Sequence, residues 1–167
     1  MVDLSFTSPQ NQKPGLIASI LECVYAPLLE SDPRIWEPER TNWEEYDREI
    51  FEYPETVGKS IFLSQLADQI VGFASWDPRQ RPRYGIIGHN CILPKFCGRG
   101  YGKRQIEEVL RRFAQIGIET ARVSTNDYPF FIPAQRMYES CGFREVRRIP
   151  WKRDPERRLI EYERKIG

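Results

Sequence analysis

The first part of the chain is predicted to contain two helices, and in the first of them apolar residues recur every three or four positions. A short strand is expected at residues 4–6, and a helix follows Pro14 and ends at Ser31-Asp32-Pro33. The run Thr41-Asn42-Trp43-Glu44 has the form of a capping box, which predicts a second helix from there to about Glu52. The apolar face of the first helix consists of Ile17, Ile20, Leu21, Val24 and Leu28.

The period changes to two after Ser60, which predicts strands. Residues 61–66 and 70–75 read as two strands that turn at Ala67-Asp68-Gln69, and residues 86–93 read as a third. Helical and strand patterns then alternate to the end of the chain. The elements expected there are a helix at 103–116, a strand at 120–125, a helix at about 133–141, and strands at 143–149 and 158–165.

This order predicts a mixed α/β fold of the α+β kind, with residues 1–167 forming a single domain, since 167 residues is near the usual domain size. A net charge of +1 argues against a dedicated nucleic-acid binder. No apolar run is long enough to span a membrane, and the N-terminus lacks the pattern of a signal peptide, so we expect a cytoplasmic protein. Four cysteines without a C-x-x-C pair and a single histidine predict free thiols and no metal site.

The most informative stretch is a glycine-rich turn between the strand at 86–93 and the helix at 103–116. Gly98, Gly100 and Gly102 allow positive φ angles and close approach of the backbone to a ligand. The start of the following helix offers N–H groups and the positive end of the helix dipole, which favour a phosphate or pyrophosphate. Arg99, Lys103 and Arg104 add positive charge.

Three named phosphate-binding motifs do not fit this turn. The dinucleotide fingerprint G-x-G-x-x-G would need glycine at Lys103. The nucleoside-triphosphate loop would need Ser or Thr at Arg104. A kinase loop would need the H-R-D and D-F-G elements downstream, which the sequence lacks.

Two motifs together resemble the GNAT superfamily of N-acetyltransferases over about residues 59–165. The first is Cys97-Gly98-Arg99-Gly100-Tyr101-Gly102, similar to the acyl-CoA pyrophosphate loop [QR]-x-x-G-x-[GA] with Cys97 in place of Gln or Arg. The second, Ala134 to Phe143, resembles A-x-x-x-Y-x-x-x-G-F. The resemblance implies a central twisted, mostly antiparallel sheet flanked by about four helices, and acetyl-CoA as co-substrate without a metal.

The resemblance also implies which residues bind the co-substrate. In the family a strand splays at a bulge, the freed backbone pairs with the acyl carbonyl and the pantetheine arm, and the loop holds the pyrophosphate through backbone N–H groups. An asparagine contacts the pantetheine arm in some members, and a turn role for Asn126 is the alternative. The matching residues are Cys91, Ile92, Leu93, Gly98, Arg99, Gly100, Tyr101, Gly102, Lys103 and Asn126.

Two residues match catalytic positions. Tyr138 matches the family tyrosine that protonates the departing thiolate, and a phenol is protonated at neutral pH. Its alternative role is to pack the helix onto the sheet. His89 lies on the strand where family members place the base that takes the amine proton, and a structural histidine is the alternative.

The acceptor is expected to be a small-molecule amine or a peptide amine. Residues 1–60 carry 12 acidic and 5 basic side chains, several of them on the second helix, which could attract a cationic amine or be a solvated surface. Aromatic residues of that region either line an acceptor pocket or belong to the core: Trp36, Trp43, Tyr46, Phe51 and Tyr53. A non-catalytic acyl-CoA-binding module is the competing function, and a homodimer is the commonest soluble assembly.

Overall fold

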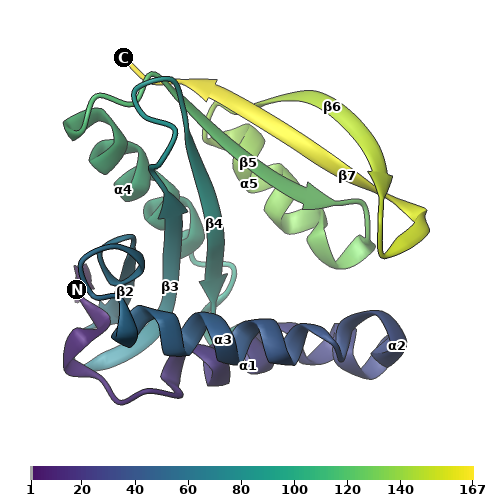
Figure 1. Cartoon of the computed structure of the whole chain (residues 1–167), viewed down its shortest axis with the longest axis horizontal. Coiled ribbons are helices and arrows are strands. Elements are labelled where there is room, and N and C mark those ends of the chain that lie inside the picture. Colours follow the sequence, from purple (N-terminus) through teal and green to yellow (C-terminus); the bar gives the residue numbers. More distant parts are fainter. Residues whose placement is uncertain (1) are drawn as a thin grey trace. The chain divides into compact units, whose positions relative to one another are not determined.

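The computed structural model describes residues 2–167, and its strands form a seven-stranded sheet in the order β1-β2-β3-β4-β5-β7-β6 (Figure 1). Pairs β1–β2, β2–β3, β5–β7 and β6–β7 are antiparallel, and β4–β5 is parallel. The mixed, mostly antiparallel fold expected from the sequence is confirmed. The strands are β1 (Leu4–Thr7), β2 (Ile61–Leu66), β3 (Gln69–Asp77), β4 (Gly85–Ile92), β5 (Thr120–Asn126), β6 (Arg144–Trp151) and β7 (Asp154–Lys165).

The described residues pack as two compact units. The first consists of residues 2–75 and 89–101, and the second of residues 76–88 and 102–167. The helices of the first unit are α1 (Leu16–Ser31), α2 (Pro33–Trp36) and α3 (Glu39–Glu52). Helix α4 (Tyr101–Gln115) leads from the first unit into the second, which also contains α5 (Ile132–Ser140).

In the first unit, α1 and α3 lie side by side and cover an apolar core (Figure 1). Ile17 and Leu21 of α1 and Ile50 of α3 are completely buried, as are Leu63 of β2 and Phe73 of β3. Helix α1 begins after Gly15, whose φ of 104° only glycine adopts readily. No side chain next to it in the sequence caps the first turn of α1, and a residue of another helix supplies the cap.

That cap is Asp47 of α3, a buried carboxylate 4% exposed. Its Oδ1 accepts a hydrogen bond from the Gly15 N–H at 2.7 Å and its Oδ2 one from the Ala18 N–H at 3.0 Å. A carboxylate at this end of a helix satisfies donors without an intrahelical acceptor and complements the helix dipole. Asp47 therefore ties α3 to the start of α1, and it is not part of a solvated acidic face.

In the second unit, β4 pairs with β5 over Gly85–Ile87 and Ala121–Val123, and β5 pairs along its whole length with β7. Helix α4 turns a strongly apolar side inward, with Ile106, Val109 and Phe113 buried. A Cβ on Gly85 would lie 2.7 Å from the Phe113 ring, so glycine there lets this helix approach the strand closely.

Two expectations about local structure were wrong. Helix α3 starts at Glu39, before the predicted capping box, and its N-cap is Pro38 without a side-chain hydrogen bond. Gly102 is the second residue of α4, whereas positive φ angles occur at Gly98 and Gly100. The helix starts earlier than predicted because Tyr101 packs into a buried cluster with Leu4, Val71 and Phe96. The elements otherwise lie within a few residues of their predicted bounds, and α2 is an additional turn.

Candidate active site

The glycine turn, residues 97–102, connects a short 3-10 turn at Pro94–Phe96 to α4. Gly98 and Gly100 have φ angles of 78° and 81°. A Cβ built on either glycine would meet nothing within 4 Å, so this stretch of backbone borders open space. The turn therefore places backbone and the positive end of the α4 dipole where an anion could approach, and these residues fit a pyrophosphate.

Aromatic packing anchors the turn. Phe96 is 7% exposed and packs with Leu4 and Val71. The Lys95 ammonium lies 5.0 Å from the centre of the Phe96 ring, and the Arg99 guanidinium lies 5.8 Å from it. Arg99 is nevertheless exposed, as is Lys103 in the first turn of α4. Positive charge thus lines the turn, and these three side chains form no ion pair with a carboxylate within residues 2–167.

Leu93, directly after β4, has both its backbone N–H and its carbonyl in hydrogen bonds. The Leu93 N–H donates to the Val71 carbonyl at 2.8 Å, and the Leu93 carbonyl accepts from the Phe96 N–H at 2.9 Å. Backbone N–H groups alternate between the two edges of a strand, so the Ile92 N–H lies on the edge away from β3. Among the residues predicted to face the acyl carbonyl, Ile92 therefore has the better-placed N–H.

The Cys97 thiol lies against the same strand end. Its sulfur is 3.5 Å from the Ile92 carbonyl oxygen and 3.7 Å from that of Leu93. Burial raises the pKa of the Cys97 thiol, so it is a protonated, weak donor at neutral pH. In this chain Cys97 supports the carbonyl of Ile92 from the position that family members fill with Gln or Arg.

Cys91 is buried and closely packed against β3. A Cβ on Gly72 would lie 2.0 Å from the Cys91 carbonyl oxygen, so only glycine permits this approach of the two strands. Burial raises the pKa of the Cys91 thiol to about 12, while a hydrogen bond with Tyr25 opposes that rise. The thiol therefore stays neutral and is not a nucleophile.

His89, the only histidine, is covered by two aromatic rings. The Tyr46 ring centre is 5.4 Å from the imidazole centre, and that of Phe73 is 5.8 Å away. The His89 backbone N–H donates to the Ser75 hydroxyl at 2.9 Å. Burial lowers the pKa of His89 to about 4. The imidazole is therefore neutral at physiological pH, which a proton acceptor requires, but it is a much weaker base than a solvated histidine.

Tyr138 lies on α5 and is 5% exposed. Its ring contacts Phe143 and Tyr162, with ring centres 6.0 and 5.8 Å away. Helix α5 ends at Cys141 and Gly142, which has a φ of 83° and takes the chain into β6. The tyrosine therefore has the packing contacts of a core residue, and these leave its catalytic role open.

Asn126 is buried at the end of β5, where it forms a turn. Its Oδ1 accepts from the Tyr128 N–H at 3.1 Å, and its backbone carbonyl accepts from Gln135 Nε2 at 3.1 Å. The Tyr128 hydroxyl in turn donates to Asp154 of β7 at 2.6 Å. The turn role left open by the sequence is thus present, and it fastens the long loop before α5 to the β6–β7 hairpin.

Two of the aromatic residues of the helical region, Trp36 and Trp43, belong to the core. The Tyr25 ring stacks on Trp36 and on Trp43, with ring centres 6.2 and 5.4 Å away. Both tryptophans are buried, whereas Tyr53 is 54% exposed. Rings that fill the space between one another leave no room for a ligand among them. Tyr46, which covers His89, is the member of the group that lies beside a predicted site residue.

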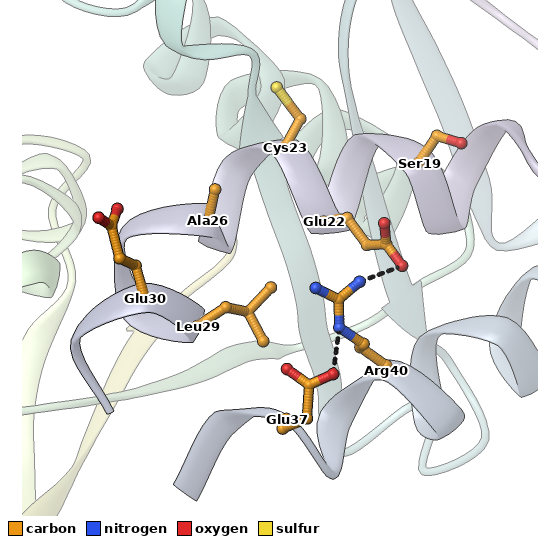
Figure 2. A pocket seen from close by; sticks show the side chains of 8 residues that line it. All are labelled: Ser19, Glu22, Cys23, Ala26, Leu29, Glu30, Glu37 and Arg40. Atoms are coloured by element: carbon orange, nitrogen blue, oxygen red, sulfur yellow. Dashed lines mark ion pairs between the residues drawn. The ribbon is translucent and has the colours of Figure 1, made fainter. Parts of the chain in front are cut away.

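A separate surface pocket of about 590 Å³ lies between α1 and the start of α3 (Figure 2). The Arg40 guanidinium contacts Glu22 and Glu37, each at 2.7 Å, so it neutralises part of the acidic lining. None of the predicted site residues lines this pocket, which is formed by Ser19, Glu22, Cys23, Ala26, Leu29, Glu30, Glu37 and Arg40.

Two kinds of feature are absent from residues 2–167. Within that range no helix combines the length and apolar character needed to cross a membrane. The same residues contain no cluster of three or more His, Cys, Asp or Glu side chains suited to holding a metal ion.

The sequence model of the acetyltransferase (GNAT) family matches residues 25–143, which is most of the chain and includes the glycine turn and Tyr138. The chain belongs to the GNAT family of N-acetyltransferases. The resemblance that rested on two motifs is thereby confirmed. A comparison with curated protein sequences found no match.

Solved structures agree with the family in fold. A protein from Desulfovibrio desulfuricans assigned to the GNAT family is similar with a TM-score of 0.78 and 16% identity, over 99% of this chain and 100% of that one. A Bacillus anthracis protein assigned as a streptothricin acetyltransferase, in complex with acetyl coenzyme A, gives 0.58 and 20%, over 64% and 62%. The ribosomal-protein-S18-alanine N-acetyltransferase of Escherichia coli gives 0.54 and 17%, over 64% and 68%.

Sequence reasoning missed the residues that surround His89. The sequence pattern predicts only strand positions for Phe73 and Ser75, and it does not decide the role of Tyr46. Tyr46 follows Trp43 by three residues and precedes Ile50 by four, so its place on the inner side of α3 was visible in the sequence. The sequence does not show the contact of Tyr46 with His89, which lies 43 positions later.

Proposed function

We propose that the protein transfers an acetyl group from acetyl-CoA to a primary amine, by direct attack of the amine within a ternary complex. The observation that carries this proposal is the glycine turn, in which two glycines with positive φ angles border open space directly before the helix α4. Family membership supports acetyl-CoA as the anion-bearing partner, and the Bacillus anthracis neighbour was solved with that molecule.

The turn would hold the pyrophosphate through backbone N–H groups of Gly98 to Lys103, with Arg99 and Lys103 adding charge. The Ile92 N–H would donate to the acyl carbonyl, where negative charge develops during attack. The proposal gives Ile92 this role over Leu93, because the Leu93 N–H is already bonded to Val71. Cys91, next to Ile92, and Asn126 are the further residues proposed to bind the co-substrate.

Proton transfers complete the reaction. The neutral amine attacks the thioester carbonyl, a C–N bond forms and the C–S bond breaks. His89 would take the proton that leaves the nitrogen, and Tyr138 would protonate the departing sulfur. The lowered pKa of His89 makes it a weak base, so this assignment fits an amine that loses its proton during attack better than one that must first be deprotonated as an ammonium ion.

The acceptor is proposed as a small-molecule or peptide amine. GNAT neighbours of both kinds exist, since one is assigned to streptothricin and another acts on the alanine of a ribosomal protein. The acidic residues of α3 give no added support to a cationic acceptor. Asp47 is used as a cap, and Arg48 contacts Glu45 and Glu52 at 3.8 and 3.4 Å.

Calorimetry with acetyl-CoA tests the co-substrate site directly. The parent protein should bind acetyl-CoA saturably, and Gly100→Val should weaken binding at least about 100-fold, because a branched side chain would enter the space next to the turn. Gly117→Val is the matched control, since Gly117 also has a positive φ of 75° and open space but follows the other end of α4. Equal affinity of the parent and Gly100→Val would remove the basis of the proposal.

Turnover tests the chemistry. Thiol release from acetyl-CoA should be followed with phenethylamine, spermidine and a peptide with a free N-terminus. Tyr138→Phe should lower kcat by about 10- to 100-fold with unchanged acetyl-CoA affinity, because the phenol donates only as the sulfur departs. Tyr53→Phe, at an exposed position, should change neither quantity. A Tyr138→Phe enzyme with parental kcat would rule out the acid role.

A further inference from the structure

The imidazole of His89 is covered on the helical side by α3 and on the sheet side by β3. Tyr46 supplies the first cover and Phe73 the second, with interplanar angles of 46° and 56°. Phe73 is completely buried and is part of the core. Tyr46 is the only one of the two whose removal would expose the imidazole without disturbing the strands of the sheet.

A polar contact joins the same three elements. The Ser75 hydroxyl on β3 accepts from the backbone N–H of His89 on β4. The Tyr46 hydroxyl is buried, and no hydrogen bond to it is seen among the described residues. The Ser75 hydroxyl lowers the pKa of Tyr46, because it favours the ionised form. Burial raises the pKa of Tyr46 to about 12, so the phenol is neutral and contributes no charge at physiological pH.

We propose that Tyr46 is a positioning residue for His89, and that its ring excludes water from one side of the imidazole and fixes the orientation of the base. This inference rests on the base role given to His89 in the proposed function. Ser75 holds the backbone of the same residue, so ring and backbone are fixed from two neighbouring elements. A base held in one orientation takes the amine proton without a prior search among rotamers.

The titratable groups around this pair are few. On α3 they are Tyr46 itself and Glu49, which raises the pKa of Tyr46. On β4 the neighbouring group is the Cys91 thiol, which is neutral and bonded to Tyr25 of α1. On β3 the contacts are Phe73 and Ser75, which carry no charge. Loss of contact with water, and not a neighbouring charge, lowers the pKa of His89.

The single histidine makes the test direct, because the imidazole protons of the folded protein give one titration curve by NMR. The parent should titrate near pH 4. Tyr46→Ala opens one side of the ring to water and should move the midpoint upward by more than about one pH unit, toward the ordinary value near 6.5. Tyr46→Phe keeps the cover and should restore a midpoint within about 0.3 units of the parent. Tyr46→Leu is a second variant in case Tyr46→Ala does not fold.

Ile50→Ala is the matched control, since Ile50 is completely buried on the same helix and is not one of the two rings seen to cover His89. A midpoint that moves no more in Tyr46→Ala and Tyr46→Leu than in Ile50→Ala would overturn the inference. Thiol release with phenethylamine gives a second readout, in which Tyr46→Ala should lower kcat about 10-fold, shift the pH profile and leave acetyl-CoA affinity unchanged.

The two proposals fail differently. If His89→Ala retains parental turnover, the base role in the proposed function is wrong. The NMR midpoints still decide whether Tyr46 controls the imidazole, because that measurement needs neither substrate. Rescue by Tyr46→Phe in both assays is the expected result, since the ring and not the hydroxyl provides the cover.

Discussion

The cap that Asp47 places on α1 gives a sharp prediction for stability. Asp47→Ala removes a carboxylate that accepts two backbone N–H groups, from Gly15 at 2.7 Å and Ala18 at 3.0 Å. Hydrogen bonds to charged groups contribute about 1.5–3 kcal/mol each, and buried donors without acceptors lose their hydration as well. We expect the free energy of unfolding to fall by about 3–5 kcal/mol.

Asp47→Asn separates charge from hydrogen bonding. A carboxamide oxygen can accept from one of the two N–H groups, while its NH₂ group faces the other, so the loss should be about 1–2 kcal/mol. Part of that loss comes from the missing negative charge at the positive end of the α1 dipole. The order of stability should therefore be parent, Asp47→Asn, Asp47→Ala.

Urea denaturation measures this series. With a slope of about 2 kcal/mol per M, Asp47→Ala should lower the midpoint by about 2 M. Glu44→Ala is the matched control, because Glu44 is an exposed acid on the same helix and its loss should change stability by less than about 0.5 kcal/mol. A free energy of unfolding for Asp47→Ala within 1 kcal/mol of the parent, at unchanged slope, would refute the argument.

Three further outcomes follow from buried contacts. The folded state keeps His89 neutral down to about pH 4, whereas His89 of the unfolded chain is protonated near pH 6.5. The free energy of unfolding of the parent should therefore fall by up to about 3 kcal/mol as the pH decreases across that window. Urea titrations at several pH values measure this, and His89→Gln should lack the pH-dependent loss. Gly72→Ala should destabilise by about 3 kcal/mol, because its Cβ would lie 2.0 Å from the Cys91 carbonyl oxygen, and thermal unfolding measures this loss; Gly98→Ala, whose Cβ would meet open space, should cost only the strain of its φ of 78°. Tyr128→Phe should lose about 1–2 kcal/mol with its 2.6 Å hydrogen bond to Asp154, and a Tyr128→Phe, Asp154→Asn double-mutant cycle without coupling would contradict that value.

Local pattern was enough for most elements. The alternating and helical periods placed the β2–β3 hairpin, β4, α4 and β5 within a few residues of their observed bounds, and the motif that resembles the family signature placed α5. The boundaries that failed depend on contacts beyond the local sequence. Helix α4 begins at Tyr101 because that side chain joins a cluster with Leu4 and Val71. Helix α3 begins before Thr41 although Thr41 and Glu44 have the spacing of a capping box.

The candidate site divides in the same way. The sequence predicts positive φ angles at Gly98 and Gly100, because glycine is the residue that adopts them at little cost. The roles of Leu93 and Asn126 could not be read in this way. Their backbone and side-chain groups are committed to Val71, Phe96, Tyr128 and Gln135, and the sequence does not state which hydrogen bonds close. The single-domain organisation and the individual site roles stay predictions.

The sequence by itself determined the family, the order of the elements and the position of the glycine turn, because each of these depends on residue types at short, fixed spacings. Only the tertiary structure decided which polar groups leave water. Asp47 and Glu44 are both acids on α3, yet one is buried as the cap of α1 and the other is exposed. His89 has an ordinary pKa as a residue type, and burial in the folded chain lowers it to about 4. Burial sets these properties, and burial arises from packing between segments far apart in the chain.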